Sequence, residues 1–413
     1  MAEGSASLPL PCTLSNSPPT DHSSRACRRL VTERANVQGC IKSQQILLRK
    51  QQEITARGCG DCSASGDSFS RYLLHHSIRN RAHGKSWRVN AAKCQAETGA
   101  APANTADNPG RLFIFGFGYT SCALAIDLRN KNWSIAGTCR NSEARSTLEN
   151  WGFHSLLFNS DNDGEELQGP GLEELQQATH WLVSIPPVGD FGKDPVLAVH
   201  GQDLIQAAGR CNVRWIGYLS STGVYGDWQG EWVDEDTEPR GSLPKALERL
   251  AAERGWLNFG RDHGVAVHVF RLGGIYGPGR NAFSTILQNR TRPGLERERR
   301  RFTSRIHVAD VCQVLTASMD NPSPGRIYNV VDDVPAPREE VFAYARDLLG
   351  VRTDEGVTRE EANTVPFFSA RCEEKRVSNK RIKEELGIRL LHPSYKSGLQ
   401  EILKDSKRTQ SCV

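Results

Sequence analysis

The chain has 413 residues and a formal net charge of +4, a length that fits one large domain or two ordinary ones. No stretch of 18 consecutive apolar residues occurs, which excludes a membrane-spanning helix on sequence grounds. The charge is uneven, because residues 1–92 hold 13 Lys and Arg against 6 Asp and Glu. The basic excess therefore belongs to the N-terminal stretch and says little about the rest of the chain.

Residues 1–92 resemble an organelle transit peptide more than a folded domain. They are rich in Ser, Arg, Ala and Cys, poor in acids, and lack the continuous apolar core of a secretory signal. Their last four residues, VNAA, are similar to a plastid processing site. We expect targeting to the chloroplast stroma, with the mitochondrion as second choice and a disordered tail as the alternative. Residues 93–109 are interpreted as a linker.

Six of the twelve cysteines lie in or just after this N-terminal stretch. Cys59 and Cys62 form a C-x-x-C, but no second Cys or His pair stands at zinc spacing, so we expect no metal site. The other six cysteines are scattered singly, which is typical of a reducing compartment and ordinary packing.

Residues 111–121 are the most informative segment. An apolar strand at 112–115 runs into a Gly-rich turn, and a helical pattern follows at 122–130. Such a strand, turn and helix form the phosphate-binding start of a dinucleotide-binding unit. The first Gly permits the tight turn, and the second lets a pyrophosphate approach the backbone; an ordinary turn is the alternative. The expected cofactor-binding turn comprises Gly116, Phe117, Gly118, Tyr119, Thr120 and Ser121.

From residue 111 onward, strands and helices alternate, which predicts an α/β fold with a Rossmann-type doubly wound parallel sheet. We expect a Rossmann domain at 110–277, a small C-terminal α/β substrate portion at 278–405 interleaved with the last strands, and a tail at 406–413. Strands are expected at 134–138, 154–158, 180–185, 213–219 and 265–272, and helices at 195–209 and 244–263.

The end of the second strand indicates the cofactor. In NAD-dependent enzymes, an acidic residue about 20 residues after the Gly-rich turn hydrogen-bonds the ribose hydroxyls of the cofactor. Residues 137–141 contain no acid but do contain Arg140, which is suited to a charge-assisted bond with a 2′-phosphate. We therefore expect NADP, leaving NAD open, with an exposed surface Arg as the alternative. The strand ends add Thr138, Ser184, Ile185 and Pro186 to the expected cofactor site.

Four later segments occur in a characteristic order: YLSSTGVYG at 218–226, RLGGIYGPGR at 271–280, SRIHVADV at 304–311 and YNVVDD at 328–333. With the Gly-rich turn, they resemble the extended short-chain dehydrogenase/reductase superfamily, also called the NAD-dependent epimerase/dehydratase family. The resemblance covers roughly residues 110–400. The segments SNKRI at 378–382 and PSY at 393–395 are similar to the YeeZ-like group of atypical members, in a plant plastid form.

The chain departs from that family at the expected catalytic helix. Typical members carry a Ser or Thr and then Tyr-x-x-x-Lys, in which the Tyr transfers a proton. The resemblance places Ser221 at the hydroxyl position, Lys245 at the Tyr position and Arg249 at the Lys position, and no Tyr lies in this helix. Arg249 is expected to hold the cofactor ribose. Lys245 acts as a base only if burial or the Arg249 charge favours its neutral form, and a solvated pair is the alternative.

Three further features are interpreted as structural or solvated. The acidic loop at 234–236 is expected to be solvated, although the family lines its substrate cleft there. His307 is expected to be a structural histidine. A cluster of arginines suits an exposed insertion better than an RNA site, since only Phe302 interleaves it. Its members are Arg290, Arg292, Arg297, Arg299, Arg300, Arg301 and Arg305.

The resemblance implies an NADP(H)-dependent oxidoreductase or epimerase/dehydratase acting on a small polar carbonyl or sugar-like substrate. The alternative is a cofactor-binding protein without turnover, serving as a sensor or interaction protein, and a third reading is an RNA-associated plastid protein. We expect a small-molecule substrate and neither a membrane nor a nucleic-acid partner, and leave a homodimer open.

Overall fold

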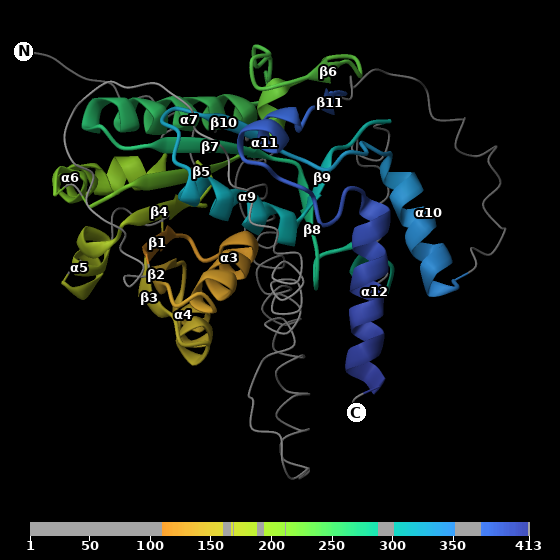
Figure 1. The fold of residues 1–413 in the computed structure, drawn as a ribbon, viewed down its shortest axis with the longest axis horizontal. Helices are drawn as coiled ribbons and strands as arrows, with labels where there is room; N and C mark the ends of the chain where they lie inside the picture. The colour runs from red at the N-terminus through yellow and green to blue at the C-terminus, as the bar shows by residue number, and fades with distance from the viewer. Residues whose placement is uncertain are drawn as a thin grey trace, which may run out of the picture. The chain divides into compact units, whose positions relative to one another are not determined.

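The computed structural model describes residues 110–159, 167, 169–187, 194–210, 212–287, 301–351 and 373–411. Its centre is a seven-stranded sheet in which all neighbouring strands run parallel (Figure 1). The strands are β1 (Arg111–Phe115), β2 (Ser134–Cys139), β3 (His154–Leu157), β4 (His180–Val183), β5 (Trp215–Ser221), β7 (Val267–Leu272) and β10 (Ile327–Val330). Their order in the sheet is β10-β7-β5-β4-β1-β2-β3.

The strand order reverses beside β1, which pairs with β2 on one side and with β4 on the other. Leu112 lies opposite Ile135 of β2 and opposite His180 of β4. In open parallel sheets, ligands bind in the crevice outside the carboxyl ends of the strands at this reversal. The topology therefore places a crevice beyond residues 115 and 183.

Helices cover both faces of the sheet because side chains along each strand alternate between the faces. Leu112 and Ile114 pack on one side, and Phe113 and Phe115 pack on the other. The first side is covered by α3 (Tyr119–Arg129), α4 (Ser142–Asn150) and α9 (Val308–Asp320), and the second by α5 (Pro170–Gln177), α6 (Pro195–Gly209) and α7 (Pro244–His263) (Figure 1). The predicted doubly wound α/β fold is thus confirmed.

The C-terminal portion builds a smaller apolar cluster around Tyr276, Phe283, Tyr395 and Leu399. The cluster joins β8 (Gly274–Tyr276), α8 (Ala282–Leu287), α10 (Arg338–Leu349) and α12 (Tyr395–Ser411), and β8 pairs with β9 (Arg305–His307). Another small pairing joins β6 (Trp232–Val233) to β11 (Arg376–Val377), near η1 (Thr222–Tyr225) and α11 (Lys380–Glu385). The α10 and α12 helices pack side by side (Figure 1).

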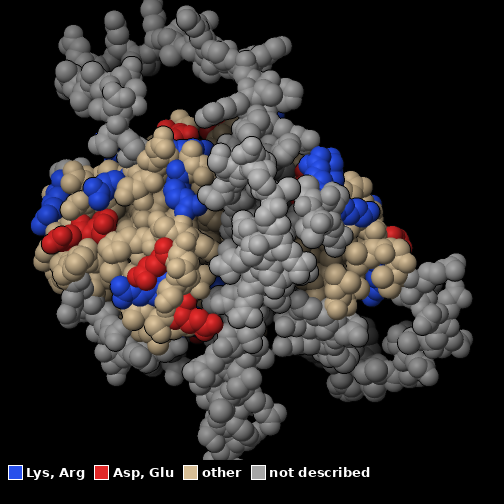
Figure 2. Space-filling view, turned by 90° about the horizontal axis from the view of Figure 1, so that it is seen from below, with Lys and Arg blue, Asp and Glu red and all other residues tan. Residues whose placement is uncertain are grey.

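The described surface mixes both signs of charge. On the face drawn in Figure 2, Lys and Arg side chains are interspersed with Asp and Glu. Within the described ranges, no helix combines the length and apolarity needed to cross a membrane. The expected transit peptide and linker lie outside the described residues.

Candidate functional site

The Gly-rich turn after β1 lies at the reversal of strand order and is held by two neighbouring strand ends. Gly116 N donates to Thr138 Oγ1 at 2.9 Å, and Phe117 N donates to the Thr138 carbonyl at 2.8 Å. Ser184 Oγ donates to the Gly116 carbonyl at 2.5 Å and accepts from Ser121 Oγ at 2.9 Å. The structure therefore brings together the residues that the sequence predicts at the ends of β1, β2 and β4.

The two glycines of the turn differ in what the fold requires of them. Gly116 has a φ of +93°, and a Cβ there would lie 2.7 Å from Ile185 Cγ1, so the turn itself demands glycine. Gly118 has a φ of −105° and a ψ of −172°, a conformation open to any residue, and a Cβ there would meet nothing within 4 Å. The side of the turn beside Gly118 is therefore open to a ligand.

The helix after this turn is suited to an anion. Gly118 is the N-cap of α3, no side chain caps the helix, and no acid stands in its first turn. The positive end of the helix dipole favours negative charge at such a terminus. Thr120 and Ser121 are buried, so the first turn presents backbone more than side chains.

Arg140 directly follows β2 and is exposed. The next residue, Asn141, caps α4 by accepting a bond from Ala144 N at 2.8 Å. Across the part of the chain that the structure describes, Arg140 makes no ion pair. Its guanidinium is therefore available to an anionic ligand at the end of β2.

The predicted catalytic residues lie at the end of β5 and in the first two turns of α7. Ser221 Oγ accepts a hydrogen bond from Gly223 N at 3.1 Å and caps η1. Gly241 N donates to the Val224 carbonyl at 2.9 Å, which holds the segment before α7 against η1. Lys245, in the first turn of α7, is exposed, so the burial that would favour its neutral form is absent.

Arg249 lies one turn further along α7 and is half-buried. Burial raises the pKa of the Tyr218 hydroxyl well above its usual range, and Asp194 raises this pKa further, whereas Arg249 lowers it. Arg249 of α7 therefore acts electrostatically on Tyr218 of β5.

A buried ion pair that the sequence interpretation missed ties α7 to the sheet. Arg271 Nη2 of β7 donates to Glu253 Oε2 of α7 at 2.8 Å, and the two side chains are 4% and 3% exposed. Ser220 Oγ donates to Glu253 Oε1. The sequence feature that indicates this ion pair is Arg271 inside the apolar strand VHVFRL, since a buried charge requires a partner.

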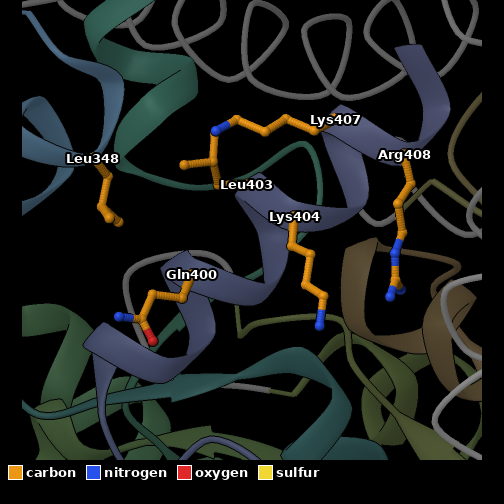
Figure 3. Close-up of a pocket in the computed structure, with 6 residues that line it drawn as sticks. All are labelled: Leu348, Gln400, Leu403, Lys404, Lys407 and Arg408. Carbon is orange, nitrogen blue, oxygen red and sulfur yellow. The ribbon is translucent and has the colours of Figure 1, made fainter. Parts of the chain in front are cut away.

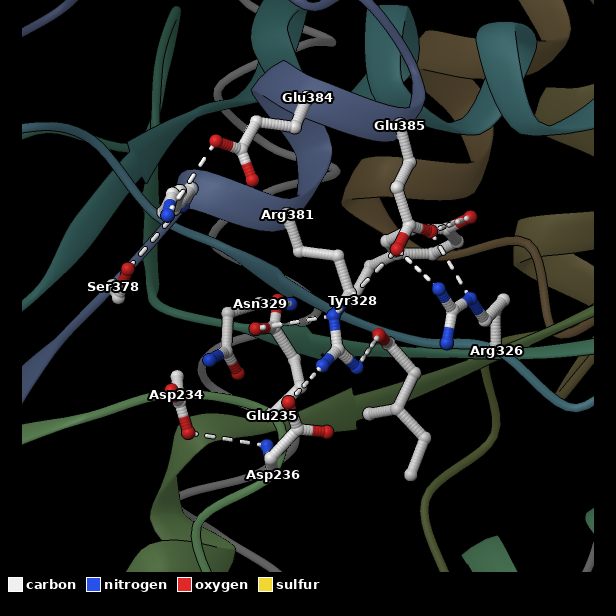
Figure 4. Close-up of polar contacts among 12 residues, drawn as sticks. Asp234, Glu235, Asp236, Arg326, Tyr328, Asn329, Ser378, Arg381, Glu384 and Glu385 are labelled. Carbon is white, nitrogen blue, oxygen red and sulfur yellow. Dashed lines mark hydrogen bonds and ion pairs between the residues drawn. The ribbon is translucent and has the colours of Figure 1, made fainter.

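The acidic loop corrects a prediction. Glu235 is buried, not solvated, and its Oε1 accepts a bond from Asn329 N at 2.7 Å (Figure 4). Burial raises the pKa of Glu235, and the Asn329 N–H opposes this rise. Asp236 remains exposed and pairs with Arg381 at 2.7 Å, and Asp234 accepts a bond from Thr237 Oγ1. The loop is therefore a structural contact with β10 and α11.

The arginine cluster divides. Arg305 is half-buried, and its Nη1 donates to the carbonyls of Thr303 at 2.8 Å and Ala336 at 2.7 Å. Burial lowers its pKa, so Arg305 does not belong to an exposed insertion. Arg301 is exposed and pairs with Glu374 at 2.9 Å. The remaining members, Arg290, Arg292, Arg297, Arg299 and Arg300, lie outside the described residues.

His307 has the structural role expected from the sequence. It is fully buried between β9 and α9, and its Nδ1 accepts a bond from Ala309 N at 3.2 Å. Its ring centroid lies 4.1 Å from that of His392. The imidazole therefore caps α9.

A pocket of about 510 Å³ lies between α10 and α12 (Figure 3). It is lined by Leu348, Gln400, Leu403, Lys404, Lys407 and Arg408. None of the predicted cofactor-binding or catalytic residues lines it. The described residues also contain no grouping of His, Cys, Asp or Glu suited to a metal ion.

Known proteins share this sequence pattern. A model of the NAD-dependent epimerase/dehydratase family matches residues 197–331. The chain is similar to protein YeeZ of Escherichia coli (strain K12), with 25% identity over 241 residues that cover 58% of this chain and 84% of YeeZ.

Solved structures share the fold. A functionally unknown conserved protein from Silicibacter pomeroyi is 40% identical, with a TM-score of 0.58 and coverage of 72% of this chain and 99% of that chain. MoeE5 in complex with UDP-glucose and NAD is 19% identical, with a TM-score of 0.55 and coverage of 73% and 99%. At that identity, the second likeness concerns the fold alone.

Proposed function

The chain belongs to the NAD-dependent epimerase/dehydratase family, and from this premise we propose that it binds NADP(H) at the Gly-rich turn and acts on a small polar carbonyl or sugar-like substrate. The observation that carries the proposal is Gly118. Its backbone is unstrained and its missing side chain leaves open space, so the fold gives no reason for glycine there. Close approach of a pyrophosphate supplies one.

The choice of NADP over NAD rests on Arg140. An acid at the end of β2 would repel a 2′-phosphate, whereas the exposed Arg140 attracts it, and residues 137–141 contain no acid. A charge-assisted bond of about 1.5–3 kcal/mol corresponds to roughly 10- to 150-fold in affinity. In calorimetric titrations of the full chain, Arg140→Ala should weaken NADPH by that factor and leave NADH nearly unchanged. An equal loss for both cofactors would contradict the role of Arg140.

When bound, the cofactor would accept a hydride from a carbon of the substrate or donate one to it. Ser221 is suited to hydrogen-bond the reacting oxygen because it lies at the carboxyl end of β5. Arg249 carries a fixed positive charge in the position where typical members hold the ribose with Lys. Lys245 is exposed on the first turn of α7. A nucleotide sugar is one substrate class to test, because MoeE5, which shares the fold, was solved with UDP-glucose.

A second candidate is a cofactor-binding protein without turnover. It is favoured by the absence of Tyr from α7 and by the exposure of Lys245. A screen of carbonyl compounds and nucleotide sugars, followed by NADPH absorbance and by chromatography of the products, separates the two. Oxidation of NADPH, or conversion of any substrate to a new product, supports the enzyme, whereas tight NADPH binding with no turnover across the screen supports the binder.

The proposed location is the chloroplast stroma, which rests on the composition of residues 1–92. A fluorescent fusion of residues 1–100 should enter plastids in plant cells. Fluorescence confined to the cytosol would contradict targeting, and fluorescence in mitochondria would favour the second choice.

A further inference from the structure

The segment after β8 forms a tight turn that the cofactor assignment leaves unused. Gly277 N donates to the Arg280 carbonyl at 2.9 Å, and Arg280 N donates back at 3.1 Å. Pro278 and Gly279 occupy the two central positions, and the φ of +72° at Gly279 is one that glycine readily adopts. Asn281 Nδ2 donates to the Gly277 carbonyl at 2.9 Å. These contacts fix the direction in which the chain leaves Arg280.

The same turn is held against the Gly-rich turn by Tyr119, the first residue of α3. The Tyr119 hydroxyl donates to the Pro278 carbonyl at 3.0 Å, across 159 residues of sequence. A Cβ on Gly277 would lie 2.6 Å from that hydroxyl and 2.7 Å from Val308 Cγ1. Glycine at 277 therefore permits the two turns to come together.

Arg280 is the charged group that this contact brings to the crevice. Its guanidinium carbon lies 5.5 Å from the centroid of the Tyr119 ring. Tyr119 directly follows Gly118 in the chain. Arg280 is exposed and has no ion-pair partner in the ranges that the structure describes. A guanidinium binds the oxygens of a phosphate with two parallel hydrogen bonds, and its planar face packs on aromatic rings.

We propose that Arg280 binds the pyrophosphate of the dinucleotide cofactor and that Tyr119 is its positioning residue. This inference rests on the proposed function and deepens it, because it adds a residue from the C-terminal side of the crevice. Arg140 is assigned to the 2′-phosphate, which only NADPH carries. Arg280 is assigned to the pyrophosphate, which NADPH and NADH share. The two arginines therefore predict different patterns of loss.

The test is calorimetric titration of the full chain with NADPH, NADH and adenosine 2′-monophosphate, which lacks the pyrophosphate. Arg280→Gln should weaken NADPH and NADH by the same factor, about tenfold or more, and leave the monophosphate unchanged. Arg280→Lys should retain part of the affinity. Tyr119→Phe, which keeps the ring and removes the hydroxyl, should give a smaller loss for both dinucleotides.

The matched control is Arg338→Gln. Arg338 lies over the Phe342 ring of α10 at 4.3 Å, so the variant removes a similar cation and ring pair at a position outside the proposed site, and all affinities should remain unchanged. Unchanged NADPH affinity in Arg280→Gln would overturn the proposal. A further titration uses UDP. Weaker UDP binding by Arg280→Gln with intact NADPH binding would also overturn the proposal, because it would assign Arg280 to a substrate phosphate. A wild-type chain that binds neither dinucleotide would overturn the proposed function as well, which distinguishes the two failures.

Discussion

Replacement of Glu253 by Gln tests how the candidate catalytic residues are held in place. Glu253 and Arg271 are almost fully buried, and Arg271 approaches the carboxylate with Nη2 at 2.8 Å and Nε at 3.3 Å. The variant keeps the shape of the side chain but leaves the Arg271 charge without a counter-charge in the interior. Breaking a buried pair in this way costs about 3–5 kcal/mol. Because Ser220 also bonds Glu253, the loss should loosen the end of β5 next to Ser221.

The assay is urea unfolding at pH 7, followed by tryptophan fluorescence, for Glu253→Gln and a control. Glu149→Gln breaks the pair with Arg145, whose side chains are 46% and 45% exposed, and should change the free energy of unfolding by less than about 0.5 kcal/mol. Replacing both buried partners, as Glu253→Leu with Arg271→Met, should recover much of the loss, since no unpaired charge remains. A cost below about 1 kcal/mol for Glu253→Gln would contradict a stabilising role for the buried Glu253–Arg271 pair.

Two further predictions concern pH and turnover. Burial raises the pKa of Asp194 from 3.8 to about 6, so the folded state keeps a proton that the unfolded state releases, and stability should fall as pH rises from about 4 to 6. In urea unfolding, Asp194→Asn should reduce the pH-dependent decrease in the free energy of unfolding by roughly 3 kcal/mol. A variant that keeps the wild-type pH dependence would contradict a raised pKa of Asp194. If a substrate is found, Ser221→Ala should reduce turnover by about 10²-fold. Lys245→Met should do the same only if the bound substrate buries Lys245. Wild-type turnover in the double variant would exclude both as catalytic residues.

Local signals in the sequence predict the elements that begin and end with characteristic residues. The helices expected at 195–209 and 244–263 are observed with those bounds, because Pro195 and Pro244 favour the first turn and Gly264 ends α7 with a φ of +67°. The Gly-rich turn was predicted in the same way, because its glycines stand between an apolar strand and a helical pattern. Its neighbours Thr138 and Ser184 followed from the rule that strand ends share one edge of the sheet.

Contacts between distant residues were not predictable in this way. The strand expected at 213–219 is observed at Trp215–Ser221, because Ser220 and Ser221, which suggest a turn, pair with β7 in the sheet. Glu235 was expected in water, and its partner Asn329 lies 94 residues away in sequence. Arg305 was assigned to the arginine cluster, whereas it bonds the carbonyl of Ala336, 31 residues on. Each error concerns a polar group whose burial is favourable only because the fold brings a partner to it.

Binding of a dinucleotide at the Gly-rich turn is tested by Gly118→Val in the full chain. A side chain at 118 meets nothing within 4 Å and suits the local φ and ψ, so the variant should fold with a stability within about 1 kcal/mol of wild type. Gly201→Val, which also adds a side chain in open space, on α6, is the matched control and should bind NADPH as wild type does. Gly118→Val should lose at least about tenfold in calorimetric NADPH affinity, because the added side chain occupies the space of the pyrophosphate. A folded Gly118→Val variant that binds NADPH as tightly as wild type would contradict dinucleotide binding at this turn.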